Sequence, residues 1–169
     1  MSRRTLFTRL RRAPRASEGA AAVEFALVLP LMAVLLFAFI EIGRLFWSYQ
    51  IASAAVRDGA RLAARLPMDC ASLTGAGDVT RVKNLVRTGA IDGTGSPLVA
   101  GWTDAASVAV AVSCIDNTGG TYSGRYLALA GVPKVQVTAT VPFSFMFGPL
   151  FGNGTMTSFQ VANQQAWTQ

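Results

Sequence analysis

An uncharged run of sixteen residues, 25–40, constrains the fold of this chain more than any other feature. From residue 19 to residue 40, the one ionisable side chain is Glu24. As a helix, residues 19–40 would span roughly 33 Å at about 1.5 Å per residue, enough to cross the hydrocarbon core of a bilayer. We therefore expect a transmembrane helix over residues 20–40. Pro30 should weaken it locally, because proline removes one backbone hydrogen bond.

A basic leader, residues 1–19, precedes this run. It contains six arginines and one glutamate, and so carries +5 of the formal net charge of +6. Two arginines fall in the twenty residues after Ile40. The positive-inside rule then places the leader in the cytoplasm and the chain from about Glu41 onward across the membrane. Arginine clusters also bind nucleic acid, but a positive flank explains these residues better, and no nucleic-acid partner is predicted.

The junction between the leader and the apolar run is built of small residues. Gly19 is followed by Ala20 and, four positions further, by Glu24 and Phe25. A secretory signal has its small cleavage residues after the apolar region, whereas a cut after Gly19 would leave the apolar helix in place. The new α-amine of Ala20 would lie one helical turn from Glu24, where the two charges neutralise each other. A carboxylate just inside an apolar segment is costly in lipid and usually marks function.

The leader, Gly19, Glu24-Phe25 and the apolar helix together resemble a class III, prepilin-type signal. With the Gly-Arg-Leu-Phe stretch at 43–46 and an Ala/Arg-rich stretch up to Leu66, the chain is similar to TadE-like pseudopilins, minor subunits of the tight-adherence (Flp-type) type IV pilus. The resemblance implies that a membrane prepilin peptidase cleaves between Gly19 and Ala20.

The same resemblance implies where the protein works and with what. The mature chain would cross the inner membrane once, with a periplasmic head, and reach the pilus or cell surface after assembly. Its partners would be major and other minor pilins, the inner-membrane assembly platform and membrane lipid. Glu24 and Phe25 would set the axial register of the subunit in the filament. No cofactor is implied.

Apolar or small residues continue at alternating spacings of three and four beyond the span. This stripe predicts that the helix runs on over residues 41–67, ends at Pro67 and packs on a head formed by residues 68–169. Glu41 and Arg44 are three positions apart, and we interpret them as a screened ion pair on the surface. The stripe consists of Ile42, Leu45, Tyr49, Ala52, Val56, Gly59, Ala63 and Leu66.

The head reads as one short helix followed by strands. Asp78 is a candidate N-cap for a helix that ends near Gly89, with Val79, Val82, Leu85 and Val86 on one side. Apolar residues then alternate over 108–114 and 135–145, and a weaker strand covers 155–162. Pro142 indicates that the later part of the second strand lies at an edge or leaves the ladder. The predicted fold class is α+β: a long N-terminal transmembrane helix continuing into a small head with an antiparallel sheet, the pilin-like plan.

Two cysteines, Cys70 and Cys114, fall in the exported part. An oxidising compartment favours a disulfide between them, and closing this loop would stabilise the head by roughly 4 kcal/mol. Two buried free thiols are the alternative. No metal site is predicted, because the chain has no histidine and two distant cysteines cannot complete a zinc shell.

No enzymatic activity is predicted. Histidine, the commonest acid–base group, is absent, and neither lysine lies in a Ser-x-x-Lys motif. Gly75-Ala76-Gly77 precedes no Gly-Lys-Ser/Thr and reads as a turn, while Asp116-Asn117 beside two glycines is a weak candidate for calcium. Three other functions stay open: an uncleaved membrane-anchored periplasmic assembly factor, a pseudopilin of a protein-secretion system, and a tethered binding module.

Overall fold

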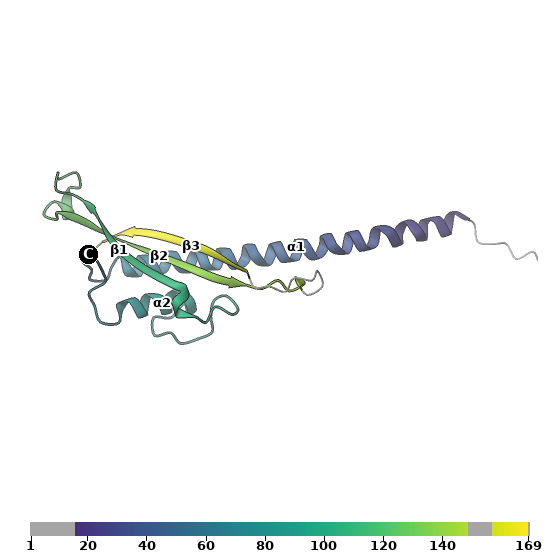
Figure 1. Ribbon diagram of the computed structural model, residues 1–169, viewed down its shortest axis with the longest axis horizontal. Coiled ribbons are helices and arrows are strands. Elements are labelled where there is room, and N and C mark those ends of the chain that lie inside the picture. Colours follow the sequence, from purple (N-terminus) through teal and green to yellow (C-terminus); the bar gives the residue numbers. More distant parts are fainter. Residues whose placement is uncertain (1–15, 149–156, 169) are drawn as a thin grey trace, which may run out of the picture. The chain divides into compact units, whose positions relative to one another are not determined.

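The computed structural model describes residues 16–148 and 157–168. The chain divides into two compact units, Met1–Ile40 and Glu41–Gln169. Helix α1 (Ala16–Ala63) contributes to both, and the second unit adds α2 (Asp78–Thr88) and the strands β1 (Val108–Asp116), β2 (Gly131–Phe143) and β3 (Thr157–Ala166) (Figure 1). The predicted α+β, pilin-like arrangement of a long apolar helix and a small antiparallel sheet is confirmed.

In the first unit, α1 is a regular helix whose side chains from residue 19 onward are almost all exposed. It continues through Pro30 without a break. By length and composition, Gly19–Ala63 contains a segment able to cross a membrane, and none of that segment is buried. Exposed apolar side chains at this density are stable in lipid, not in water, and are typical of a membrane anchor or a signal.

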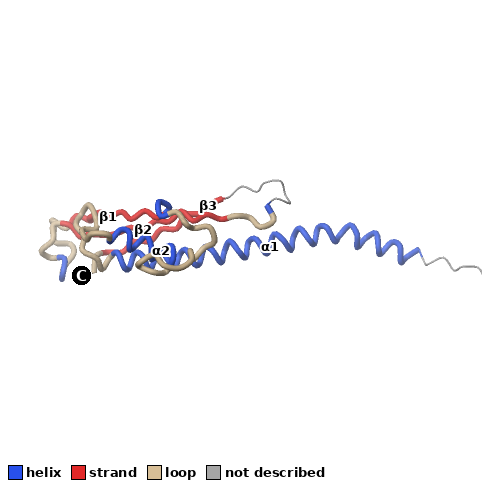
Figure 2. Tube along the Cα trace, turned by 90° about the horizontal axis from the view of Figure 1, so that it is seen from below, coloured by secondary structure: helices blue, strands red, loops and turns tan. Residues whose placement is uncertain are grey.

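In the second unit, one face of α1 forms the core with the sheet and α2. Figures 1 and 2 show the three strands and α2 beside this part of α1. The predicted stripe is correct from Ala52 onward but wrong at Ile42 and Tyr49, which are 51% and 44% exposed. The residues of α1 that are buried in the core are mostly small: Ala52, Ala55, Val56, Gly59, Ala60 and Ala63.

Helix α1 ends at Ala63, slightly before the predicted end at Leu66. The difference reflects a tighter last turn, in which Leu66 N donates to Ala63 O at 3.1 Å. The C-terminal segment meets this end of the helix, since Thr168 N donates to Ala64 O at 3.0 Å.

The sheet has the order β1-β2-β3, with both pairs antiparallel. Alternate residues of β2 face the core, as predicted. Because β1 begins at Val108, opposite Ala139, the end of β2 pairs with β3 alone, and Pro142 lies in this one-sided stretch. Of the two alternatives for Pro142, the edge position is confirmed, and the strand does not leave the ladder because Pro142 pairs with Ser158. Strand β3 runs four residues past its predicted end at residue 162.

Helix α2 differs from the prediction at its first turn. The N-cap is Gly77, in the left-handed conformation at φ 78°, and Asp78 makes no capping bond. The Asp78 carboxylate instead accepts from Arg81 at 3.3 Å. Val82 and Val86 are buried as predicted, whereas Val79 is exposed. Gly89 ends the helix, also as predicted, with its N–H bonded to Leu85 O at 2.9 Å.

Candidate functional site

The candidate processing and assembly residues all lie on the first unit's part of α1. Gly19, Ala20, Glu24 and Phe25 are exposed, and Ala20 and Glu24 are one helical turn apart. A Cβ added at Gly19 would meet nothing within 4 Å. The packing of the described residues therefore does not require glycine at this position. No residue in the described part of the chain forms an ion pair or hydrogen bond with the Glu24 carboxylate.

A second acidic residue of α1 has a different environment. Glu41 is buried in the second unit, with 8% of its surface exposed. Its Oε2 lies 2.9 Å from the Arg44 guanidinium, and its Oε1 accepts a hydrogen bond from Phe147 N, also at 2.9 Å. The Arg44 guanidinium lies over the Phe143 ring, 5.5 Å from its centroid. Interpreting Glu41 and Arg44 as a screened surface pair was wrong for Glu41, because the segment after β2 returns to cover it.

Glu41 therefore holds segment 144–147 against α1 through its hydrogen bond to Phe147 N. Substitutions can distinguish the contribution of this hydrogen bond from that of the negative charge of Glu41. We expect Glu41→Gln to cost less than about 1 kcal/mol, because the amide oxygen still accepts from Phe147 N. Glu41→Ala removes that acceptor and should cost about 1–3 kcal/mol. Hydrogen exchange of the Phe147 amide should be faster in the alanine variant and near normal in the glutamine variant. Equal exchange in the two variants would contradict this function.

Aromatic side chains surround the Glu41 end of the second unit. Leu45, Phe46, Tyr49 and Phe159 line a hollow of about 270 Å³, and the Tyr49 and Phe159 rings lie 5.7 Å apart. Phe145 packs its edge against Phe143 with ring centroids at 5.3 Å. Such a lining offers mainly van der Waals contact to an apolar partner.

The predicted disulfide between Cys70 and Cys114 is present, with Cα atoms 5.1 Å apart. It joins the segment after α1 to β1, so the alternative of two free thiols is wrong. Beside it, the Ala71 and Ser72 N–H groups both donate to the Asp69 carboxylate at 2.7 Å. These backbone bonds hold the pKa of Asp69 below its usual value. The carboxylate thus stabilises this turn above the ordinary pKa of aspartate, and the stabilisation is lost as the pH falls through the lowered pKa.

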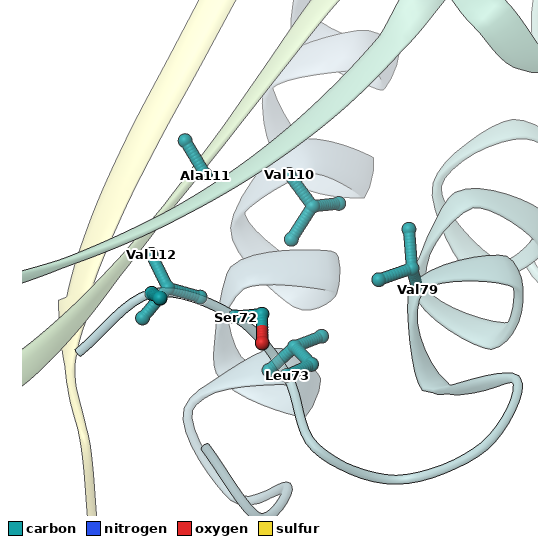
Figure 3. A pocket seen from close by; sticks show the side chains of 7 residues that line it. Ser72, Leu73, Val79, Val110, Ala111 and Val112 are labelled. Atoms are coloured by element: carbon teal, nitrogen blue, oxygen red, sulfur yellow. The ribbon is translucent and has the colours of Figure 1, made fainter. Parts of the chain in front are cut away.

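A second hollow, of about 210 Å³, lies between β1, α2 and the segment after Cys70 (Figure 3). Ser72 is its one polar side chain; the others are Ala71, Leu73, Val79, Val110, Ala111 and Val112. A catalytic or ligand-binding pocket needs several polar groups that converge on one point. This hollow lacks them and carries no case for an activity.

The weak calcium candidate has another explanation. The Asn117 side-chain amide donates to Tyr126 O at 2.8 Å and its Oδ1 accepts from Tyr122 N at 2.8 Å. Asp116 accepts from the Thr118 hydroxyl at 3.0 Å. These polar groups organise the loop between β1 and β2. Within the described residues, no three acidic, histidine or cysteine side chains are grouped as they would be around a metal ion.

Comparison with known proteins gives one match. The family model described as TadE-like protein matches residues 19–61. No curated protein and no solved structure matches the chain. The match begins at the candidate cleavage residue and includes Glu24, Phe25 and Glu41, while residues 62–169 lie outside it. The similarity to the TadE-like family seen in the sequence is therefore confirmed over residues 19–61.

Proposed function

We propose that this protein is a minor pilin or pseudopilin that takes part in the assembly or initiation of a Tad type IV pilus. The observation that carries the proposal is the family match that starts at Gly19, on an exposed apolar helix. The similarity to the TadE-like family supports an association of the chain with the Tad pilus machinery. A prepilin peptidase would remove residues 1–19, and the mature chain would keep α1 from Ala20 as its membrane anchor.

The charge asymmetry of the sequence supports an orientation. Six arginines precede the apolar segment, so the N-terminus would stay in the cytoplasm and the head would lie in the periplasm. In this orientation the subunit would enter the pilus from the inner membrane, in contact with the assembly platform and with other pilins. Phe25, 66% exposed beside Glu24, would pack against the next subunit or lipid.

The first experiment determines the N-terminus. Intact mass and N-terminal sequencing of the protein from native membranes, with and without the prepilin peptidase, should give a chain beginning at Ala20 in the presence of the peptidase alone. A full-length chain in both strains would overturn the processing step. It would favour an uncleaved, membrane-anchored periplasmic assembly factor. If the protein were cleaved and worked as part of a secretion machine in a strain that lacks the pilus, it would be a secretion pseudopilin.

Glu24 is expected to act in assembly and not in cleavage. It has no partner within the described chain, and after cleavage the Ala20 amine of its own or a neighbouring subunit would neutralise it in lipid. Glu24→Gln should therefore be cleaved normally but be absent from sheared pili. Glu24→Asp, which retains the charge, should restore part of the incorporation. If Glu24→Gln blocked cleavage and nothing else, the role in register would be wrong.

A further inference from the structure

Large apolar side chains that remain exposed in the second unit gather at its Glu41 end. Six of the twelve in the described part of Glu41–Gln169 lie in residues 42–49 and 145–146, and we name them the collar. The collar consists of Ile42, Phe46, Trp47, Tyr49, Phe145 and Met146. Four of these six are aromatic, including the most exposed, Trp47, at 72%. Aromatic rings at such positions are favoured where one end of a ring meets hydrocarbon and the other meets water.

On α1 the collar covers close to half of the helix circumference, because Tyr49 lies on the side of Ile42 and Phe46 while Trp47 lies on another. Ile42 and Phe46 are one turn apart and share a side of α1, whereas Trp47 points about 100° away from Phe46. Trp47 and Phe46 are both more than 60% exposed. A protein partner of ordinary size covers one side of a helix, while a lipid interface surrounds it. Trp47 extends the exposed apolar surface beyond the side that Ile42, Phe46 and Tyr49 share, and this extension favours lipid as the occupant.

The collar residues of α1 follow the apolar run at a distance in the sequence that suits a bilayer interface. Glu41 directly follows Ile40, the last residue of the uncharged run. Phe46 and Trp47 follow by about 10 Å along the helix axis, and side chains on a helix tilt back toward its N-terminus. The polar interface of a bilayer is about 5–8 Å thick on each side. The collar rings of α1 would thus reach the headgroup layer when the apolar run occupies the hydrocarbon.

Segment 144–147 is held at this level by specific contacts. The Phe147 N–H bond to Glu41, at 2.9 Å, fixes the segment beside the first turn of the second unit. Phe145 rests edge-on against Phe143, yet 40% of its surface stays exposed, and Met146 is 58% exposed. A segment anchored in this way, with apolar side chains directed outward, has the form of a membrane-contacting loop.

Charge does not oppose this contact. Within residues 41–49 and 143–148 the charged side chains are Glu41 and Arg44, and they pair at 2.9 Å. The collar therefore enters the interface without carrying an uncompensated charge. It contains no basic cluster that would select anionic lipid, so the contact should be insensitive to salt.

We propose that the collar docks the head on the bilayer surface, with Phe145 and Met146 in the lipid interface beside α1. The docked face is the one around Glu41, so the head has a defined orientation on the membrane before assembly. The inference rests on the proposed membrane anchor and adds a second, sequence-distant contact with lipid.

The test uses the full chain in phosphatidylcholine vesicles, at high lipid excess, with lipids brominated in the acyl chain. In a Trp47→Phe background, one tryptophan is added per variant: Met146→Trp in the collar, Val34→Trp in the apolar run, or Leu127→Trp. Leu127 is the matched control, because it is 67% exposed and precedes the opposite end of β2. The emission of Trp102 and Trp167 is common to all variants and is subtracted.

The expected result is loss of most of the added emission for Met146→Trp and Val34→Trp, with none for Leu127→Trp, in low and high salt alike. If the added emission were quenched in Val34→Trp but not in Met146→Trp, the docking of the collar would be overturned and the membrane anchor would stand. If neither variant were quenched, both the docking and the membrane anchor would be overturned. A blue shift of Met146→Trp emission that appears only at high protein-to-lipid ratio, without quenching, would assign the collar to another copy of the chain and overturn the proposal.

Discussion

Replacing Cys70 and Cys114 together by alanine is expected to lower the free energy of unfolding of the head by about 4 kcal/mol. The disulfide spans 44 positions, so its removal restores much conformational freedom to the unfolded chain. Cys70 is exposed and Cys114 half-buried, so the substitution leaves no large cavity. The loss should therefore come from the cross-link and not from packing. Urea unfolding of the full chain in detergent, followed by the fluorescence of the buried Trp102, measures it.

Wild-type protein kept reduced is the matched control for this variant. It should unfold at the same urea concentration as the double alanine variant, since both lack the cross-link and keep the rest of the core. If the oxidised, reduced and alanine forms unfolded together within about 1 kcal/mol, the disulfide would not be a principal stabiliser. A reduced form as stable as the oxidised one, beside a much weaker alanine variant, would point to packing of the thiols.

Alanine at two glycines of α1 is expected to change stability in opposite directions. A Cβ at Gly59 would lie 2.3 Å from a γ-methyl of Val86, which is fully buried on α2. Relieving that overlap means moving α2 or forcing a stiff β-branched side chain off its rotamer, a cost of about 1–3 kcal/mol. A Cβ at Gly43 would meet nothing within 4 Å. There, Gly43→Ala should stabilise the helix by up to about 1 kcal/mol.

The contrast between the two glycines is the measurement. Both are on the same helix, and both substitutions reduce the flexibility of the unfolded chain equally. Urea unfolding of the two variants should therefore bracket the wild type. If Gly59→Ala were also stabilising, α2 would not pack against α1 at this point, and the core of the second unit would be arranged differently.

The parts of the fold in which apolar residues recur at regular spacing were predictable from the sequence. The uncharged run 25–40 and the small-residue face near Ala52 indicate one long helix, and the alternation over 108–114 and 135–145 indicates two strands, the second of which ends at Phe143. The end of β3 was missed because residues 163–165 are Asn-Gln-Gln, which have little strand preference. They form a strand because β2, the central strand, supplies their partners.

The Glu41 contact had no sequence signal. Its partner Phe147 lies 106 positions away, and local spacing relates Glu41 to Arg44 alone. The burial of Trp102, whose indole N–H donates to the Ser107 hydroxyl at 2.8 Å, was equally hidden, since the surrounding residues follow neither helical nor strand spacing. Gly19, Ala20, Glu24 and Phe25 were identified because their motif is short and contiguous. Their roles in processing and register stay predictions.

The contacts that stabilise the head are formed by residues that follow the proposed cleavage position in the sequence. The disulfide, the core and the Glu41 bonds are all formed within Glu41–Gln169, while the proposed cut falls twenty-two residues earlier in the sequence, after Gly19. Removal of the leader therefore leaves these contacts in place. Head maturation and peptidase action can occur in either order, and a cell lacking the peptidase should accumulate precursors whose heads are already oxidised and folded. Such a precursor pool would be ready for use as soon as the enzyme appears.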